Sequence, residues 1–248
     1  MYEANALRRD LVKYSQRIWE RGWVANHDGN LSVRVDKSRI LATPTAFSKG
    51  EVREDDLLLI EIWTGKVLSG RHRPFSELPL HLEYYQVRPD VQAVIHAHPP
   101  VACGFAIAGL EVDPRITPEA VVSIGDRIPL APTVKPGSLA ARQQIRSLGT
   151  LYDAVMLGNH GTVVCGSDLE MAYLRTELVE HLAKMQQQAM LLGNLRLIQD
   201  EWVAELMKKR KSAGLGPEAR GAQTPPARVL ADLPVEEIIS SMVEQLKA

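Results

Sequence analysis

The sequence Val94-Ile95-His96-Ala97-His98-Pro99 places two histidines one residue apart at the end of an apolar run, residues 91–95. Such a run is typical of a buried strand, and in a strand residues i and i+2 face the same way. His96 and His98 are therefore expected to project together, as two ligands of one divalent metal ion would. Burying two imidazoles without a partner costs free energy, so the pair favours a metal site. A structural role remains the alternative for the pair alone.

A third histidine and a carboxylate extend this pattern. His160 stands in a Gly-Asn-His-Gly sequence after the apolar run 154–157, and Glu77 precedes the histidine pair. Three histidines and an acid are the inventory of a catalytic zinc site with one position open for substrate. Structural roles are expected for three further histidines, which lie in a loop or in predicted helices: His72, His81 and His181.

Composition narrows the class of protein. The chain has 248 residues, of which 45% are hydrophobic and 24% are charged, and its formal net charge is −1. These values are ordinary for a globular enzyme and give no support for binding nucleic acid or an anionic membrane. The N-terminus lacks an apolar signal segment and no run approaches a membrane span, so a cytoplasmic location is expected.

The periodicity of apolar residues predicts a mixed fold. Strands are expected at residues 31–35, 39–42, 57–62, 91–95, 128–131, 154–157 and 162–166. Helices are expected at residues 3–22, 76–88, 100–108, 138–148 and 168–210, the last with a break at Gly193-Asn194. Ser76 is placed to cap the second of these helices, which would carry Glu77 in its first turn. The order of elements predicts a layered α/β domain around a mostly antiparallel sheet.

The composition changes after Lys211, which divides the chain into three parts. Residues 1–211 form the predicted catalytic domain, and residues 212–228 are rich in glycine and proline, as in a flexible linker. In residues 229–248 apolar side chains repeat at steps of three and four, which predicts an amphipathic helix. A helix this short is only marginally stable alone in water, so it is expected to bind something.

Five short motifs occur along the chain in this order: Asp28-Gly29-Asn30-Leu31-Ser32, Thr43-Pro44-Thr45, Ser76-Glu77, His96-Ala97-His98-Pro99 and Asn159-His160-Gly161. Through these motifs the chain resembles, over about residues 5–210, the class II aldolase and adducin family, in particular its fuculose-phosphate aldolases. The resemblance implies a three-layer α/β/α fold and a homotetramer with active sites near subunit interfaces. It also implies that His96, His98 and His160 bind Zn²⁺ and that Glu77 is the catalytic acid and base.

The resemblance further implies a phosphate pocket. The expected contacts are backbone N–H groups and small polar side chains of Gly29, Asn30, Thr45, Ala46 and Ser76. The chain departs from the aldolases at Ala46, where they usually have glycine, and at Phe75, where they have serine or threonine. His27 replaces a small residue and is therefore a further candidate for substrate contact.

The activity implied by the resemblance is zinc-dependent cleavage of a ketose 1-phosphate. Fuculose 1-phosphate is the expected substrate, and dihydroxyacetone phosphate and lactaldehyde are the expected products. Glu77 favours an aldolase over the 4-epimerases of the family, which typically have aspartate there. Decarboxylase and dehydratase activities remain alternatives, as does an adducin-like, non-catalytic interaction module, against which the complete histidine triad argues.

The C-terminal part resembles the encapsulation peptides of bacterial microcompartments, which join a small-residue tether to one amphipathic helix. This resemblance implies shell or cargo proteins as partners of residues 229–248 and a location in the microcompartment lumen. Confinement would suit a reactive aldehyde product. The alternative is that this helix packs against its own subunit or against a neighbour in the oligomer.

Overall fold

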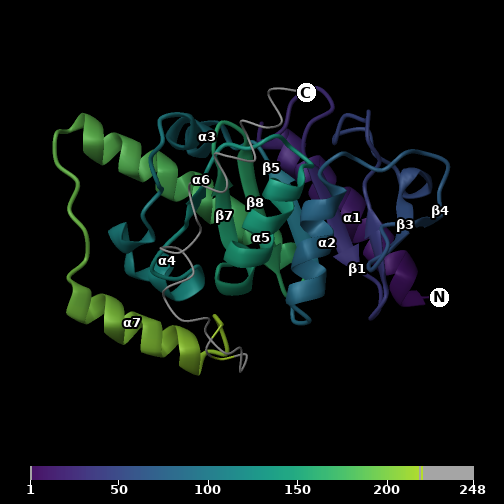
Figure 1. The fold of residues 1–248 in the computed structure, drawn as a ribbon. Coiled ribbons are helices and arrows are strands. Elements are labelled where there is room, and N and C mark those ends of the chain that lie inside the picture. Colours follow the sequence, from purple (N-terminus) through teal and green to yellow (C-terminus); the bar gives the residue numbers. More distant parts are fainter. Residues whose placement is uncertain (1, 218, 220–248) are drawn as a thin grey trace, which may run out of the picture.

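An eight-stranded sheet forms the centre of the residues that the computed structural model describes, 2–217 and 219 (Figure 1). Its strands lie in the order β4-β3-β2-β1-β5-β8-β7-β6, and every neighbouring pair is antiparallel except β6–β7. The strands are β1 (Asn30–Arg34), β2 (Arg39–Ala42), β3 (Leu58–Glu61), β4 (Val67–Ser69), β5 (Ala93–Ala97), β6 (Leu130–Ala131), β7 (Ala154–Leu157) and β8 (Gly161–Gly166). The predicted mostly antiparallel sheet is confirmed.

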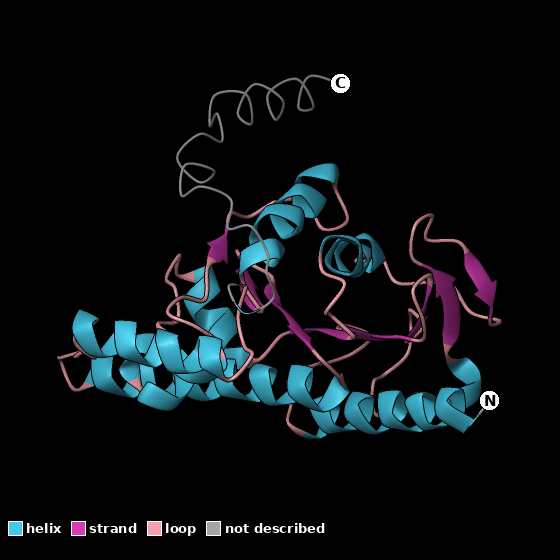
Figure 2. Cartoon of the chain, turned by 90° about the horizontal axis from the view of Figure 1, so that it is seen from below, coloured by secondary structure: helices cyan, strands magenta, loops and turns pink. Residues whose placement is uncertain are grey.

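Helices cover both faces of the sheet, which gives the expected three layers (Figure 2). The described helices are α1 (Tyr2–Glu20), α2 (Leu78–Val87), α3 (Pro100–Ile107), α4 (Pro118–Ser123), α5 (Leu139–Leu151), α6 (Leu169–Leu191) and α7 (Asp200–Ser212). One layer consists of α2 and α5, and the other contains α1, α3 and α6. At the edge of the second layer α7 packs against α4.

The central strand β5 is buried on both faces because its alternate side chains enter different cores. Val94 belongs to the core beneath α2 and α5, whereas Ile95 belongs to the core beneath α1. This alternation follows from the two-residue period of a strand. His96 therefore lies on the α2 side of the sheet, two residues beyond Val94.

The beginning of α2 differs from the prediction. The helix starts at Leu78, with Glu77 at the N-cap position, so Glu77 is not in the first turn. The predicted cap by Ser76 was wrong, because the Ser76 hydroxyl donates to Glu77 Oε1 at 2.9 Å and makes no bond to a helix N–H. The predicted break near Gly193 is present, with residues 192–199 connecting α6 to α7.

The C-terminal predictions fall largely beyond the described part of the chain. Residues 229–248 and most of the linker 212–228 lie outside the described residues, so the division into domains stays a prediction. In the described part of the chain, no helix combines the length and apolar character that a membrane crossing requires.

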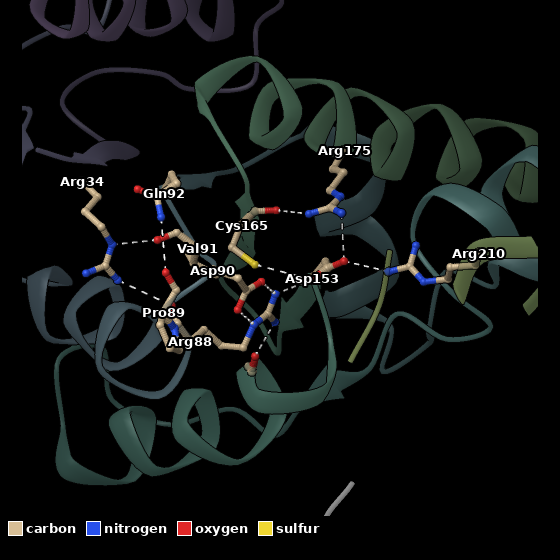
Figure 3. A network of polar contacts seen from close by, with 11 residues as sticks. Arg34, Arg88, Pro89, Asp90, Val91, Gln92, Asp153, Cys165, Arg175 and Arg210 are labelled. Carbon is tan, nitrogen blue, oxygen red and sulfur yellow. Dashed lines mark hydrogen bonds and ion pairs between the residues drawn. The ribbon is translucent and has the colours of Figure 1, made fainter. Parts of the chain in front are cut away.

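A buried carboxylate joins the helix layers at one end of the sheet (Figure 3). Asp153, directly before β7, accepts hydrogen bonds or ion pairs from Arg88 at 2.9 Å, Arg175 at 3.0 Å and Arg210 at 2.7 Å. These arginines come from the end of α2, from α6 and from α7, and all four side chains are buried. The cluster therefore links one strand to helices on both sides of the sheet.

Replacement of Asp153 by asparagine is expected to destabilise the fold strongly. The change leaves three buried guanidinium groups without the Asp153 carboxylate. Breaking a buried ion pair in this way lowers the free energy of unfolding by about 3–5 kcal/mol. The free energy of unfolding in urea measures this effect. The matched variant Asp126→Asn, at an exposed position, should unfold like the wild type, and equal stability of the two variants would contradict the role of the cluster.

Candidate metal centre and active site

Neighbouring strands bring the three predicted metal ligands together. His96 near the end of β5 lies between Asn30 of β1 and Val163 of β8. His98 follows the same strand by one residue, and His160 lies in the turn that joins β7 to β8. The candidate ligand atoms of His96, His98 and His160 all lie within 4.8 Å of one another. The predicted triad is thus one cluster.

Hydrogen bonds orient two of these rings so that their Nε2 atoms meet. His96 Nδ1 lies 3.0 Å from the Thr162 carbonyl oxygen, and His98 Nδ1 lies 3.0 Å from Asp28 Oδ2. Because both partners are acceptors, each Nδ1 carries the hydrogen and each Nε2 presents a lone pair. The two Nε2 atoms are 3.0 Å apart. Ligands of a tetrahedral Zn²⁺ with Zn–N bonds of about 2.0 Å are separated by roughly 3.3 Å, so this donor set fits such an ion.

Burial keeps two of the imidazoles, those of His96 and His160, in the neutral form that a metal requires. Desolvation lowers the pKa of His96 well below its usual value, and the neighbouring histidines lower it further. Desolvation also lowers the pKa of His160, and His98 adds to this effect. A neutral imidazole is the ligand form, so protons compete with a metal only at low pH.

Gly161, the first residue of β8, leaves space for the histidine rings. A Cβ on Gly161 would lie 2.5 Å from Cδ2 of His98 and 2.6 Å from the carbonyl oxygen of Ala97. Asn159 adopts a left-handed conformation with φ 54°, and its Oδ1 accepts a hydrogen bond from the Thr133 hydroxyl. Sequence reasoning quoted Gly161 and Asp28 only as parts of motifs and missed both roles.

Glu77 lies in the same cavity as the triad, held by two polar neighbours. Asn30 Nδ2 donates to Oε2 at 3.2 Å, and the Ser76 hydroxyl donates to Oε1. Asn30 is the cross-strand partner of His96, which places the carboxylate beside the metal ligands. The arrangement can hold a cation and a proton-transferring group against one substrate.

The cavity measures about 180 Å³ and contains most of the predicted site residues. Its lining consists of His27, Asp28, Gly29, Asn30, Pro44, Thr45, Phe75, Ser76, Glu77, His96, His98 and His160. Ala46 is outside this lining and has a left-handed backbone with φ 62°. His27 and Phe75, singled out as departures from the aldolases, both line the cavity.

A neutral histidine supports the wall behind Phe75. The rings of Phe75 and His81 lie 5.0 Å apart, and His81 Nδ1 is 2.7 Å from the Ser32 hydroxyl oxygen. Complete burial lowers the pKa of His81 to about 3, so this ring stays uncharged at neutral pH. Its position behind the cavity wall agrees with the structural role expected for it.

Comparison with known proteins places this site in a family. The sequence profile of the class II aldolase and adducin N-terminal domain matches residues 9–187. The chain belongs to the class II aldolase and adducin family. This membership confirms both the predicted family and the predicted lyase class. Class II aldolases are metal-dependent enzymes.

Relatives within the class II aldolase family carry two different activities in their names. A 3-oxo-tetronate 4-phosphate decarboxylase of Pectobacterium atrosepticum is 31% identical over 205 residues, which cover 80% of this chain and 91% of the relative. An L-fuculose phosphate aldolase of Methanococcus vannielii is 31% identical over 177 residues, covering 71% and 93%. A solved structure of L-fuculose 1-phosphate aldolase superposes with a TM-score of 0.77 at 28% identity, covering 83% of this chain and 96% of that chain.

Asp28→Asn is expected to weaken zinc binding. The Asp28 carboxylate orients the His98 ring and makes its other nitrogen more basic, and the amide lacks that negative charge. Loss of such a partner typically lowers metal affinity by about 10- to 100-fold. Competition with a chromophoric chelator measures the dissociation constant. The exposed Asp55→Asn variant is the control, and zinc affinity equal to the wild type in Asp28→Asn would show that the Asp28–His98 bond is unimportant.

Proposed function

We propose that this chain is a zinc-dependent aldolase that cleaves fuculose 1-phosphate, a ketose 1-phosphate, to dihydroxyacetone phosphate and lactaldehyde. The observation that carries the proposal is the convergence of three imidazoles and the Glu77 carboxyl group in one cavity. A relative that covers most of the chain and is named L-fuculose phosphate aldolase supports it.

The donor set suits Zn²⁺ with one open position. His96, His98 and His160 would hold the ion, and three neutral nitrogens would leave its full charge undiminished. When bound, zinc supplies Lewis-acid stabilisation of negative charge on substrate oxygens. Asp28 and the Thr162 carbonyl keep two of the ligands in the required tautomer.

Glu77 would move the proton that the cleavage requires. The C3–C4 bond of the ketose breaks, its electron pair stays on C3, and C4 becomes the aldehyde carbon as its hydroxyl releases a proton to water. The acid form of Glu77 delivers a proton to C3, and in the synthetic direction the carboxylate removes that proton. Asn30 and Ser76 hold the carboxyl group in place for both directions.

Another part of the cavity lining would bind the phosphate group. Gly29, Asn30, Thr45 and Ser76 line it, and backbone N–H groups at the start of α2 favour negative charge there. Ala46 enters this proposal only through its backbone, because the residue lies outside the cavity lining.

Turnover of fuculose 1-phosphate is expected to depend on both zinc and Glu77. Chelation should abolish formation of dihydroxyacetone phosphate and added Zn²⁺ should restore it, because the Lewis acid is lost and regained. Glu77→Gln should lower kcat by about 10²- to 10⁴-fold, the usual contribution of general acid–base catalysis. A coupled reduction of dihydroxyacetone phosphate measures both effects.

Two variants define the controls for this assay. His96→Ala should lose zinc and activity together, whereas Glu51→Gln, at an exposed position, should keep both. A zinc-loaded protein that leaves fuculose 1-phosphate intact would refute the proposed substrate.

Decarboxylation of a phosphorylated 3-oxo acid is the second candidate, and the relative named 3-oxo-tetronate 4-phosphate decarboxylase favours it. Loss of CO₂ next to a carbonyl also leaves an electron pair on carbon, so the same ion and the same Glu77 proton would serve. Release of CO₂ from 3-oxo-tetronate 4-phosphate distinguishes this reaction from aldol cleavage.

We further propose that residues 229–248 bind a shell or cargo protein of a bacterial microcompartment and that the enzyme works there as a homotetramer. Arg210, near the end of α7, is tied to Asp153, which precedes β7, whereas His160 follows β7. The described chain therefore ends at the end of the sheet remote from the metal ligands.

Deletion of residues 229–248 is expected to leave kcat, zinc content and oligomeric state unchanged while abolishing association with shell proteins. The reason is that the deleted segment is distant in sequence from every residue of the cavity. Light scattering after size exclusion measures the oligomer, and encapsulation of a fluorescent fusion measures targeting.

Neighbouring substitutions test which predicted face of the segment binds. Ile239→Asp on the apolar face should abolish encapsulation, and Ser240→Asp on the polar face should retain it, although both add the same charge. Dissociation of the oligomer on deletion would instead support packing within the enzyme.

A further inference from the structure

A buried lysine lies behind the two loops that line the cavity. Lys49 is only 1% exposed. Its Nζ donates to the carbonyl oxygen of Phe47 at 2.7 Å and to that of His27 at 3.4 Å. One carbonyl belongs to the loop before β1 and the other to the loop after β2. The ammonium group therefore bridges the two loops that supply His27 and Thr45 to the cavity.

Both loops contain a strained residue next to the carbonyl that Lys49 binds. Asn26, before His27, has φ 50°, and Ala46, before Phe47, has φ 62°. Non-glycine residues adopt this left-handed conformation at an energetic cost, and surrounding contacts must maintain it. The bridge from Lys49 is such a contact, and an apolar side chain of similar length could donate to neither carbonyl.

Lys49 is charged but unpaired in the described part of the chain, and the carboxylates that act on it, Asp28 and Glu77, line the cavity. Among the described residues, no ion pair includes Lys49. Burial lowers its pKa to about 8, while the carboxylates of Asp28 and Glu77 raise it, so the cation persists at neutral pH. A buried charge with only neutral hydrogen-bond partners acts on nearby anions through a weakly screening interior.

We propose that Lys49 is a positioning residue for the phosphate group of the substrate. Its ammonium group holds the Asn26–His27 and Ala46–Phe47 segments in their strained conformations and places a positive charge behind the cavity wall that Thr45 lines. This role rests on the proposed action on a phosphorylated substrate, and it concerns binding of the phosphate end only.

The test compares variants of the full-length, zinc-loaded protein that separate charge from hydrogen bonding. Lys49→Met removes both, Lys49→Gln keeps N–H donors without charge, and Lys49→Arg keeps both. Calorimetry measures the Kd of dihydroxyacetone phosphate, and the aldol assay measures KM and kcat. Lys37→Met, at an exposed position, is the matched control.

The expected result is a phosphate-specific binding defect. Lys49→Met and Lys49→Gln should raise Kd and KM about tenfold with kcat changed by less than about threefold, the pattern of lost uniform binding. Lys49→Arg should restore Kd to within about threefold of the wild type, because the charge is retained. Circular dichroism and zinc content should match the wild type in each variant compared.

Two results would overturn the proposal. Wild-type affinity for dihydroxyacetone phosphate in folded Lys49→Gln would show that the charge is irrelevant, and a fall in kcat at constant KM would place Lys49 in the chemical step. The binding measurement is independent of turnover. A tenfold loss of affinity in a chain that cleaves no ketose phosphate would support the role of Lys49 while refuting the aldolase proposal.

Discussion

One carboxylate, buried at an end of the sheet, contacts three guanidinium groups, and the geometry of the site depends on it. Arg88 ends α2, whose other end begins at Glu77, and Asp153 starts the segment that continues through β7 to His160. Because charges removed from water require close partners, these ion pairs determine where helix and strand sit. Glu77, the proposed acid, and His160, the third proposed metal ligand, thus lie at one end of α2 and β7, and the ion pairs of Asp153 fix the other end of each element.

Groups of different charge lie in and around the cavity. The imidazoles of His96 and His160 lie close together, with Glu77 in the same cavity. Lys49 lies behind the loops at the side where the phosphate is proposed to bind. The proposed substrate, which has carbonyl and hydroxyl oxygens at its reacting end and a phosphate group at the other end, would match this arrangement of charges.

The sequence predicted those features that depend on local patterns. The two-residue period of residues 94–98 was sufficient to pair His96 with His98, and apolar periodicity located the strands on both sides. The predicted helix start at Ser76 was wrong, and α2 begins at Leu78. A serine before a helix can cap it or donate to a neighbouring carboxylate, and the local sequence is the same in both cases.

Contacts between segments far apart in the sequence could not be predicted from local patterns. Asp28 meets His98 across 70 positions, and Gly161 is required by rings from another strand. The burial of Lys49 is similarly invisible in a stretch rich in charged and polar residues, since lysines in such stretches are usually solvated. In each case the informative partner lies on a different element.

His160 and the Asp153 cluster lie at opposite ends of the same strand, β7. Substitutions near Asp153 can therefore alter the reserve of stability without replacing any residue that lines the cavity. Over many generations, sequence drift at that end would change how much destabilisation the chain tolerates elsewhere. New specificities, which usually arise through destabilising changes around a cavity, could then be accommodated by compensating changes at the other end of the sheet.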